Sequence, residues 1–264
     1  MTPTEPETAL HHGDFGEIEG YVADRVIFQH YRTHDTWSPS VLKLLLTLLD
    51  DRAGTLIDVG ANIGLVSIPV AQRSRAQVHA LEPEPRNFRL LQRNVRHQGL
   101  GRRISIHPWA ADEQDRVVYM QRSLDNYGDH HIPSTGTVNA KTGIPIQARP
   151  LDHLLTAVGQ ELPRPLVVKI DTQGYEDKVL QGGQRLLTQA DAVILEYWPS
   201  GVRRAGGDLN LLHERLCSFA RGAILSPSES DSLPELHPTA TLCKALEEQF
   251  ADRNPGFVDL LLMP

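Results

Sequence analysis

The sequence predicts an α/β fold built around a mostly parallel sheet, and two observations indicate this fold class. From Thr55 onward, short runs of apolar and β-branched residues alternate with amphipathic segments of helical length, as in consecutive strand–helix–strand units. The first apolar run ends at Asp58 and leads into a loop that contains Gly60 and Gly64. In parallel sheets, such glycine loops let a ligand approach the backbone at the carboxyl ends of the strands. The expected architecture is a parallel sheet with helices on both faces.

The region before the sheet is expected to be less regular. Within residues 1–36, a short hairpin at 18–29 is the one regular element that we expect. Ser38 and Pro39 then predict the start of a helix, with serine as the N-cap and proline at the first helical position, and the apolar run 41–51 continues it.

From Thr55 to the end of the chain, strands and helices are expected to alternate. The expected strands are 55–59, 77–81, 104–107, 166–170, 192–195, 223–225 and 257–262. The expected helices are 64–73, 85–97, 151–158, 175–180, 209–220 and 242–250. Pro69 lies inside the first of these helices, so we expect this helix to lose a backbone hydrogen bond and to kink.

A polar stretch at 123–143 interrupts the alternation between two segments, 117–120 and 144–148, that read as antiparallel strands. It is rich in Asn, Gly, His, Ser and Thr. An irregular excursion of about 20 residues inside a compact domain is usually functional or disordered. We therefore expect this stretch to contribute to a binding site.

The chain is expected to form one main domain with an N-terminal cap. At 264 residues it suits a single decorated α/β domain better than two full domains. We expect residues 1–52 to cap the site, and residues 53–264 to form the domain, with insertions at 122–147 and 226–252. The cap is expected to place over the site a group of aromatic and histidine side chains, namely His30, Tyr31, His34 and Trp37.

Composition narrows the partners and the compartment. The formal net charge of −7 argues against a broad surface for nucleic acid or for an anionic membrane, so we expect neither partner. Cys217 and Cys243 provide neither a disulfide framework nor a zinc site. Residues 1–14 are polar and lack the apolar core of a secretion signal. We expect a cytoplasmic protein, and its oligomeric state stays open.

The spacing between the glycine loop and a later acid predicts the ligand. Glu82 follows the second expected strand, about 20 residues after Gly60, where an acid accepts hydrogen bonds from ribose hydroxyls. Asn62 stands where a dinucleotide-binding loop carries glycine, and Asp58 would repel a phosphate but suit an ammonium group. The pattern therefore predicts S-adenosylmethionine, which combines an adenosine with a cation, rather than a dinucleotide.

The ordered set of motifs closely resembles the FkbM-type methyltransferases, S-adenosylmethionine-dependent enzymes that act mainly on hydroxyls of natural products and glycans. The matching segments are Asp58–Gly64, Glu82–Phe88 with Asn94, Leu151–Asp152, Lys169–Glu176 with Val179, Leu180 and Gly182, and Glu196–Pro199. The resemblance implies a Rossmann-like methyltransferase fold, with a mostly parallel seven-stranded sheet and an antiparallel C-terminal strand. It also implies that the cofactor is held by Asp58, Gly60, Ala61, Asn62, Gly64, Glu82, Pro83, Ala110, Ala111 and Asp171.

A hydroxyl acceptor benefits from a base that removes its proton during attack. The candidate catalytic residues are Asp171, Lys169, Glu196, His130 and His131. Lys169 and Asp171 lie two apart on a strand and share one face, so Lys169 is either a desolvated base or a simple ion-pair partner. We expect no metal centre, because Asp171 and Glu196 lack a third ligand and Gln173 stands where many relatives carry an acid.

The predicted function is methylation of a hydroxyl on a small-molecule natural product, sugar or glycan, with S-adenosylmethionine as the methyl donor. A nicotinamide-dependent oxidoreductase is one alternative, which the sequence of the glycine loop disfavours. A non-catalytic binding module that keeps the cofactor fold is another. Residues 10–50, 122–147 and 198–240 carry no motif that identifies the acceptor.

Overall fold

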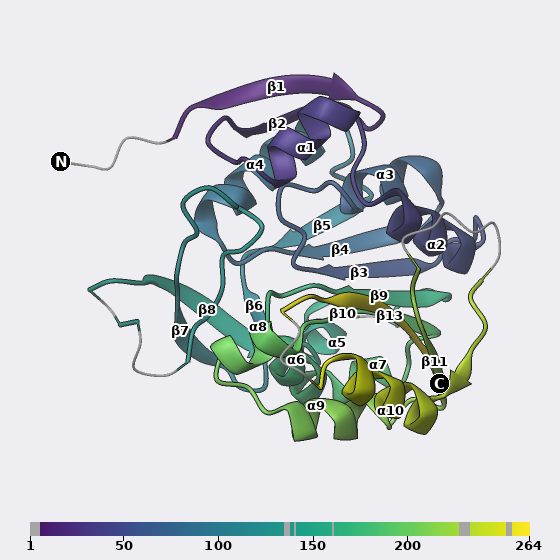
Figure 1. The fold of residues 1–264 in the computed structure, drawn as a ribbon. Helices are drawn as coiled ribbons and strands as arrows, with labels where there is room; N and C mark the ends of the chain where they lie inside the picture. The colour runs from purple at the N-terminus through teal and green to yellow at the C-terminus, as the bar shows by residue number, and fades with distance from the viewer. Residues whose placement is uncertain (1–5, 135–137, 140, 160, 227–232, 252–254) are drawn as a thin grey trace.

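The computed structural model describes residues 6–134, 138–139, 141–159, 161–226, 233–251 and 255–264. Its centre is an eight-stranded sheet with the order β12-β11-β13-β10-β9-β3-β4-β5 (Figure 1). These strands are β3 (Thr55–Val59), β4 (Gln77–Leu81), β5 (Ile104–His107), β9 (Leu166–Ile170), β10 (Ala192–Tyr197), β11 (Arg221–Ile224), β12 (His237–Pro238) and β13 (Val258–Met263).

The directions of these strands confirm a mostly parallel sheet. The pairs β3–β4, β4–β5, β3–β9 and β9–β10 are parallel, and the C-terminal strand β13 lies antiparallel between β10 and β11. The predicted count of seven strands was one too few, because the two-residue β12 pairs with β11 at the edge. A strand this short carries no periodicity that a sequence pattern can reveal.

Helices cover both faces of the sheet, as predicted. One face carries α2 (Pro39–Leu49), α3 (Ser67–Arg73) and α4 (Pro85–His97), and the other carries α5 (His153–Ala157), α6 (Glu176–Gly182), α7 (Gln184–Leu187), α9 (Leu209–Leu216) and α10 (Thr239–Gln249) (Figure 1). Neighbouring residues of β3 point to opposite faces of the sheet. Leu56 packs in the hydrophobic core under α2, α3 and α4, and Ile57 packs in the core on the other face. The thiols of Cys217 and Cys243 lie 3.6 Å apart between α9 and α10.

The N-terminal region is more regular than the sequence suggested. A hairpin of β1 (Thr8–Gly13) and β2 (Gly16–Tyr21) is followed by α1 (Ile27–His34), so the hairpin predicted at 18–29 was misplaced. The hairpin lies over α4 (Figure 1). The Asn94 side chain accepts a hydrogen bond from the backbone of Glu19 and donates one back, at 2.8 and 3.0 Å. The Glu19 carboxylate also pairs with Arg93 at 2.7 Å.

Two expectations about helix starts need correction. Ser38 does precede α2, but its backbone is left-handed (φ 46°) and its side chain makes no capping hydrogen bond. Pro39 occupies the first helical position as predicted, so its fixed φ sets the helix start. Pro69 lies in the first turn of α3, where the ring is tolerated, because the helix starts at Ser67 rather than at Gly64.

A second, three-stranded sheet lies beside the main sheet. It contains β6 (Ala110–Asp112), β7 (Arg116–Met120) and β8 (Ile144–Pro150), in the order β6-β8-β7. The antiparallel pairing of β7 with β8 was predicted, whereas β6 was not. Between β7 and β8, His131 pairs through its backbone with Gln121 and turns the polar insertion back toward the main sheet. Residues 135–137 and 140 of this insertion, and 227–232 and 252 of the second, lie outside the described residues.

Candidate active site

A cavity of about 610 Å³ opens at the carboxyl ends of the parallel strands. Its lining includes the ends of β3, β4, β9 and β10 together with the polar insertion. In the sheet, β3 has β4 on one side and β9 on the other, so the strand order switches at this point. Ligands of open α/β sheets bind at such switch points, and the volume lies within the usual range for small-molecule sites.

The glycine loop after β3 brings two strand ends into close contact. Gly60 has φ +85°, and a Cβ at this position would lie 1.9 Å from the carbonyl oxygen of Asp171. The backbone N–H groups of Gly60 and Ala61 both donate to the carbonyl of Leu81, at 3.0 and 2.9 Å. Glycine is therefore required where β3, β4 and β9 converge on the cavity.

Glu82 places a buried carboxylate in the wall of the cavity. Its two oxygens accept hydrogen bonds from the backbone N–H groups of Asn62 and Glu84, each at 2.8 Å. Burial raises the pKa of Glu82 to about 8, because desolvation outweighs these hydrogen bonds and the nearby acids add repulsion. A ligand hydroxyl that donates to this carboxylate would favour its charged form.

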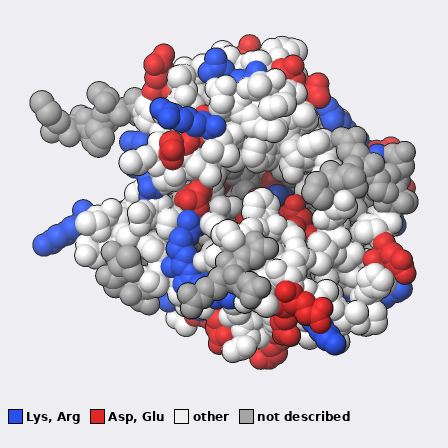
Figure 2. All heavy atoms as spheres, viewed as in Figure 1, with Lys and Arg blue, Asp and Glu red and all other residues white. Residues whose placement is uncertain are grey.

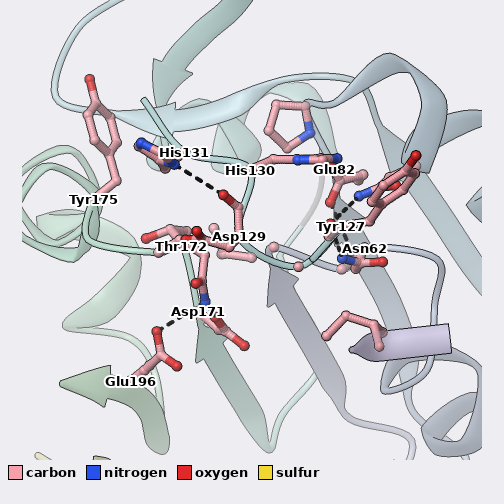
Figure 3. A pocket seen from close by; sticks show the side chains of 18 of the residues that line it. Asn62, Glu82, Tyr127, Asp129, His130, His131, Asp171, Thr172, Tyr175 and Glu196 are labelled. Carbon is pink, nitrogen blue, oxygen red and sulfur yellow. Dashed lines mark hydrogen bonds between the residues drawn. The ribbon is translucent and has the colours of Figure 1, made fainter. Parts of the chain in front are cut away.

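Asn62 connects the glycine loop to the polar insertion. Its backbone is left-handed (φ 52°), which asparagine tolerates better than most residues. Its side-chain amide donates to the carbonyl of Tyr127 at 3.0 Å, and Asn87 donates to the same carbonyl at 3.0 Å. Two amides, one from the loop after β3 and one from α4, thus position Tyr127 at the cavity (Figure 3).

Lys169 is enclosed by carboxylates. Its Nζ lies 3.5 Å from Asp58 Oδ1 and 3.4 Å from Asp171 Oδ2. Burial alone would lower the pKa of Lys169, but the charges of Asp171 and Asp58 outweigh burial and raise it above its ordinary value. Lys169 therefore remains an ammonium at neutral pH. The geometry favours the ion-pair role over the role of base.

A cluster of acids surrounds this ammonium at the ends of β9 and β10. Gln173 donates through one amide nitrogen to Asp171 Oδ1 at 2.9 Å and to Glu196 Oε2 at 3.2 Å. Burial, followed by the charge of Asp171, raises the pKa of Glu196 well above its ordinary value and that of Asp259 to about 6. An ionised acid at position 173 could not donate to both carboxylates, so this arrangement requires the amide.

The adjacent histidines of the insertion use their ring nitrogens differently. His130 is buried, and its Nδ1 accepts a hydrogen bond from the backbone N–H of Ser123 at 3.0 Å. The ring of His131 donates instead, from Nδ1 to the carbonyl of Asp129 at 3.1 Å (Figure 3). Burial lowers the pKa of His130, so this ring stays neutral.

Most of the residues predicted from sequence meet at this cavity. Asp58 and Gly64 do not line it: Asp58 is fully buried and accepts a hydrogen bond from Ser67 at 2.6 Å, and Gly64 packs against Ile68 and Leu91. The predicted residues that line the cavity are Gly60, Ala61, Asn62, Glu82, Pro83, Ala110, Ala111, His130, His131, Lys169, Asp171 and Glu196.

Sequence reasoning missed much of the aromatic wall. The aromatic residues of the lining are Trp37, Trp109, Tyr127, Tyr175, Trp198 and Phe257, of which only Trp37 was expected. Trp109 and Trp198 could have been predicted, because in the sequence they lie close to the predicted site residues Ala110 and Glu196. Of the other residues expected to cap the site, Tyr31 is buried against Phe15, and His30 stacks on His34.

Three further observations concern metal ligands, surface charge and membrane-spanning helices. Within the described ranges, no group of three or more His, Cys, Asp or Glu side chains is arranged to hold a metal ion. On the face shown in Figure 2, basic and acidic side chains are interspersed around the hollow rather than gathered into one basic area. None of the helices in the described parts of the chain combines the length and the apolar character needed to cross a membrane.

Comparisons with known proteins identify this chain as similar to methyltransferases. The family model for the FkbM methyltransferase domain matches residues 58–214. The hexuronic acid methyltransferase AglP of Haloferax volcanii is 28% identical over 184 residues, which cover 68% of this chain and 72% of the relative. The 2-O-methyltransferase NoeI of Sinorhizobium fredii is 25% identical over 196 residues, which cover 70% of this chain and 79% of the relative.

A solved structure, the FkbM methyltransferase from Methylobacillus flagellatus KT, aligns at a TM-score of 0.48 and 17% identity, over 80% of this chain and 43% of that one. Because the family model covers more than half of the sequence, the protein belongs to the FkbM methyltransferase family.

Proposed function

We propose that this chain transfers a methyl group from S-adenosylmethionine to a hydroxyl group of a sugar or glycan. The observation that carries the proposal is the carboxylate of Glu82, buried at the end of β4 beside the Gly60 loop and open to a cavity of about 610 Å³. A carboxylate in this position accepts hydrogen bonds from the hydroxyls of a ribose.

The residues of the cavity fit S-adenosylmethionine. The close approach of Gly60 to Asp171 leaves backbone within reach of a ligand, and the buried Nε2 of His130 has no hydrogen-bond partner among the described residues. Glu82, Asn62, Ala110 and Ala111 would hold the adenosine, and Asp171 the charged end. When bound, S-adenosylmethionine supplies a methyl group that its sulfonium already activates. Asp58 would act indirectly, through Lys169 and Ser67.

The other half of the cavity suits a sugar. Carboxylates and the Gln173 amide accept and donate hydrogen bonds to hydroxyls, and aromatic walls such as Trp198 and Tyr175 offer flat apolar surfaces. The two relatives named above act on a hexuronic acid and at a 2-O position, which supports a sugar hydroxyl as the acceptor class. Residues 1–52 would cap the cavity, because Val26, Ile27 and Trp37 line it.

Calorimetric titration with S-adenosylhomocysteine tests the cofactor, with NAD as a parallel injectant. We expect saturable binding of S-adenosylhomocysteine and none of NAD. Glu82→Ala should weaken binding by about 10²-fold, since hydrogen bonds to a charged group contribute about 1.5–3 kcal/mol each. Glu248→Gln, a change on the exposed side of α10, is the matched control and should bind normally. Binding of NAD alone would replace the proposal with a nicotinamide-dependent oxidoreductase.

Mass spectrometry of acceptor mixtures tests the reaction. The protein is incubated with S-adenosylmethionine and either neutral sugars, hexuronic acids or hydroxylated natural products. We expect formation of S-adenosylhomocysteine together with a methylated sugar. A methylated natural product would keep the methyltransferase and change the acceptor class. Cofactor binding without any methylated product in all three mixtures would favour a non-catalytic binding module.

A further inference from the structure

We propose that His131 is the general base of this transfer, and that Asp129 and Arg204 are positioning residues that hold its ring in place. The inference rests on the proposed function and adds to it the residue that receives the acceptor's proton. Two adjacent histidines line the cavity, and the hydrogen bonds of each ring determine which nitrogen can accept a proton.

His131 has the nitrogen that a base needs. A carbonyl oxygen can only accept a hydrogen bond, so the contact between Nδ1 and the Asp129 carbonyl requires the proton to be on Nδ1. In the neutral ring, Nε2 then carries the free lone pair. The backbone is also held, because His131 and Gln121 exchange hydrogen bonds at 3.1 and 2.8 Å. This is the arrangement of a base whose tautomer is set by a partner on its other nitrogen.

Arg204 fixes the segment that orients this ring. Its guanidinium binds both oxygens of Asp129, at 2.6 and 3.2 Å, and donates to the carbonyl of Gln173 at 3.3 Å. The guanidinium also lies over the ring of Trp198, 4.6 Å from its centroid. Asp129 is thus held by its side chain and orients His131 with its carbonyl. The insertion is tied in this way to the Asp171–Gln173 loop at the end of β9.

His130 cannot take the same role. Its Nδ1 accepts from the backbone N–H of Ser123, so in the neutral ring the proton must be on Nε2. No nitrogen of the neutral ring is left to accept a proton. Its Nε2–H is a donor, buried and without a partner among the described residues, and it is suited to a ligand oxygen rather than to a hydroxyl proton.

The other candidates, Lys169, Asp171 and Glu196, already bind one another or the Gln173 amide. Lys169 is an ammonium between Asp58 and Asp171, and Asp171 accepts from Lys169 and Gln173. Glu196 accepts from Gln173 and lies near the charge of Asp171. Among the three nitrogen candidates, Lys169, His130 and His131, His131 is the one with a lone pair that no other group of the described residues occupies, whereas Asp171 and Glu196 are carboxylates held in the network around Lys169 and Gln173.

The proposed step balances. The acceptor oxygen forms a bond to the methyl carbon, and the bond from that carbon to sulfur breaks with its electron pair going to sulfur. His131 Nε2 receives the proton of the acceptor hydroxyl, and the imidazolium later releases it to solvent. Because Nδ1–H stays bonded to the Asp129 carbonyl, the positive ring remains in place.

Nitrogen-15 NMR of the histidine rings in the free protein tests the assignment without an acceptor. We expect His131 as the Nδ1–H tautomer and His130 as the Nε2–H tautomer, with signals assigned from His131→Asn and His130→Gln. In Arg204→Lys the His131 signals should broaden or show both tautomers, because a lysine cannot bind both Asp129 oxygens. A His131 ring protonated only on Nε2 would overturn the proposal.

Steady-state kinetics supply the second readout, with the acceptor that the mass-spectrometric assay identifies as substrate. Asparagine at position 131 keeps a donor for the Asp129 carbonyl and removes the base, so kcat of His131→Asn should fall by about 10²–10⁴-fold with KM little changed. The acidic limb of the kcat–pH profile should vanish, and added imidazole should restore part of the rate. His12→Gln, on the exposed hairpin, is the matched control.

Three outcomes separate the base from its alternatives and from the proposed function. Loss of the acidic limb in Glu196→Gln, but not in His131→Asn, would assign the base to Glu196. Equal loss in Arg204→Lys and His131→Asn, without imidazole rescue, would indicate a structural role for His131. Failure of the wild type to bind S-adenosylhomocysteine would instead overturn the proposed function, and the tautomers would then show the ring geometry alone.

Discussion

Glu82 comes directly after β4 and Glu196 is the next-to-last residue of β10; both are buried, yet their surroundings differ. The Glu82 carboxylate accepts hydrogen bonds from the backbone N–H groups of Asn62 and Glu84, both of which lie within about 20 residues of it in the chain. Glu196 lies in a cluster of side chains that come from β3, β9, β10 and β13, with Lys169 as its nearby cation. One carboxylate is held by local backbone and the other by distant side chains.

This difference separates the two halves of the cavity. The half around Glu82 is built from backbone groups of a short loop, so its geometry depends little on which side chains lie elsewhere. The half around Glu196 depends on charges that compensate one another and on residues of the insertion and of α8 (Pro199–Arg204). We expect a variant of the loop backbone to act through sterics, and variants of the buried charged groups to depend on pH.

The largest effect is expected from Gly60→Ala. The new Cβ would clash with the Asp171 carbonyl at 1.9 Å, and the residue would be held at φ +85°. Strain and overpacking together should cost about 4 kcal/mol of unfolding free energy, measured by urea titration. Gly99→Ala is the control, since it also has positive φ (+67°) but meets nothing within 4 Å and should lose only about 1 kcal/mol. Equal losses of unfolding free energy in both variants would show that the close approach of residue 60 to the Asp171 carbonyl is not what requires glycine in this loop.

Lys169→Met should have the next largest effect, about 3 kcal/mol at pH 8, because it leaves the charges of Asp58 and Asp171 without a cation. The loss should shrink at pH 5, where the neighbouring carboxyls of Glu196 and Asp259, whose pKa values burial raises, hold protons and add less repulsion. Thermal and urea unfolding at both pH values measure it, with Lys244→Met on the exposed side of α10 as the control. A loss that does not change with pH would show that packing, rather than charge, holds this half together.

Gln173→Glu should cost about 2 kcal/mol at pH 8. The variant loses two charge-assisted hydrogen bonds, to Asp171 and Glu196, and adds a like charge between them. Urea unfolding of this variant beside Gln249→Glu, an exposed change at the end of α10, measures the difference. An unchanged or higher stability would mean that the Gln173 amide does not bridge the two acids.

Glu82→Gln should change how the free energy of unfolding depends on pH. Within any one pH unit, this change is smaller than the three losses above. The folded protein holds a proton on Glu82 up to about pH 8, whereas the unfolded chain releases it near 4.5. Stability therefore falls as pH rises through this window, by at most about 1.4 kcal/mol per pH unit for one proton. Unfolding curves between pH 4 and 9 should show a shallower fall in the variant and no change of slope in Glu248→Gln. Parallel slopes in wild type and Glu82→Gln would contradict the raised pKa.

The sheet and the glycine loop after β3 were predictable because their signals are local. The apolar runs of β3, β4 and β9, and the spacing from Gly60 to Glu82, lie within segments short enough for sequence periodicity to report them. The elements that were missed or misplaced are short or depend on partners. The strand β6 exists through its pairing with β8, and the hairpin β1–β2 is docked on α4 through Asn94 and Arg93.

The sequence by itself determined the α/β class, the order of strands and helices, and most of the predicted residues that line the cavity, because periodicity and a glycine loop act over a few residues. Only the tertiary structure decided that Lys169 pairs with Asp58, that Asp58 lies behind the cavity wall, and that His130 and His131 use opposite nitrogens. The reason is physical. Protonation and hydrogen-bond direction depend on groups brought together from distant parts of the chain, and no local pattern records those neighbours.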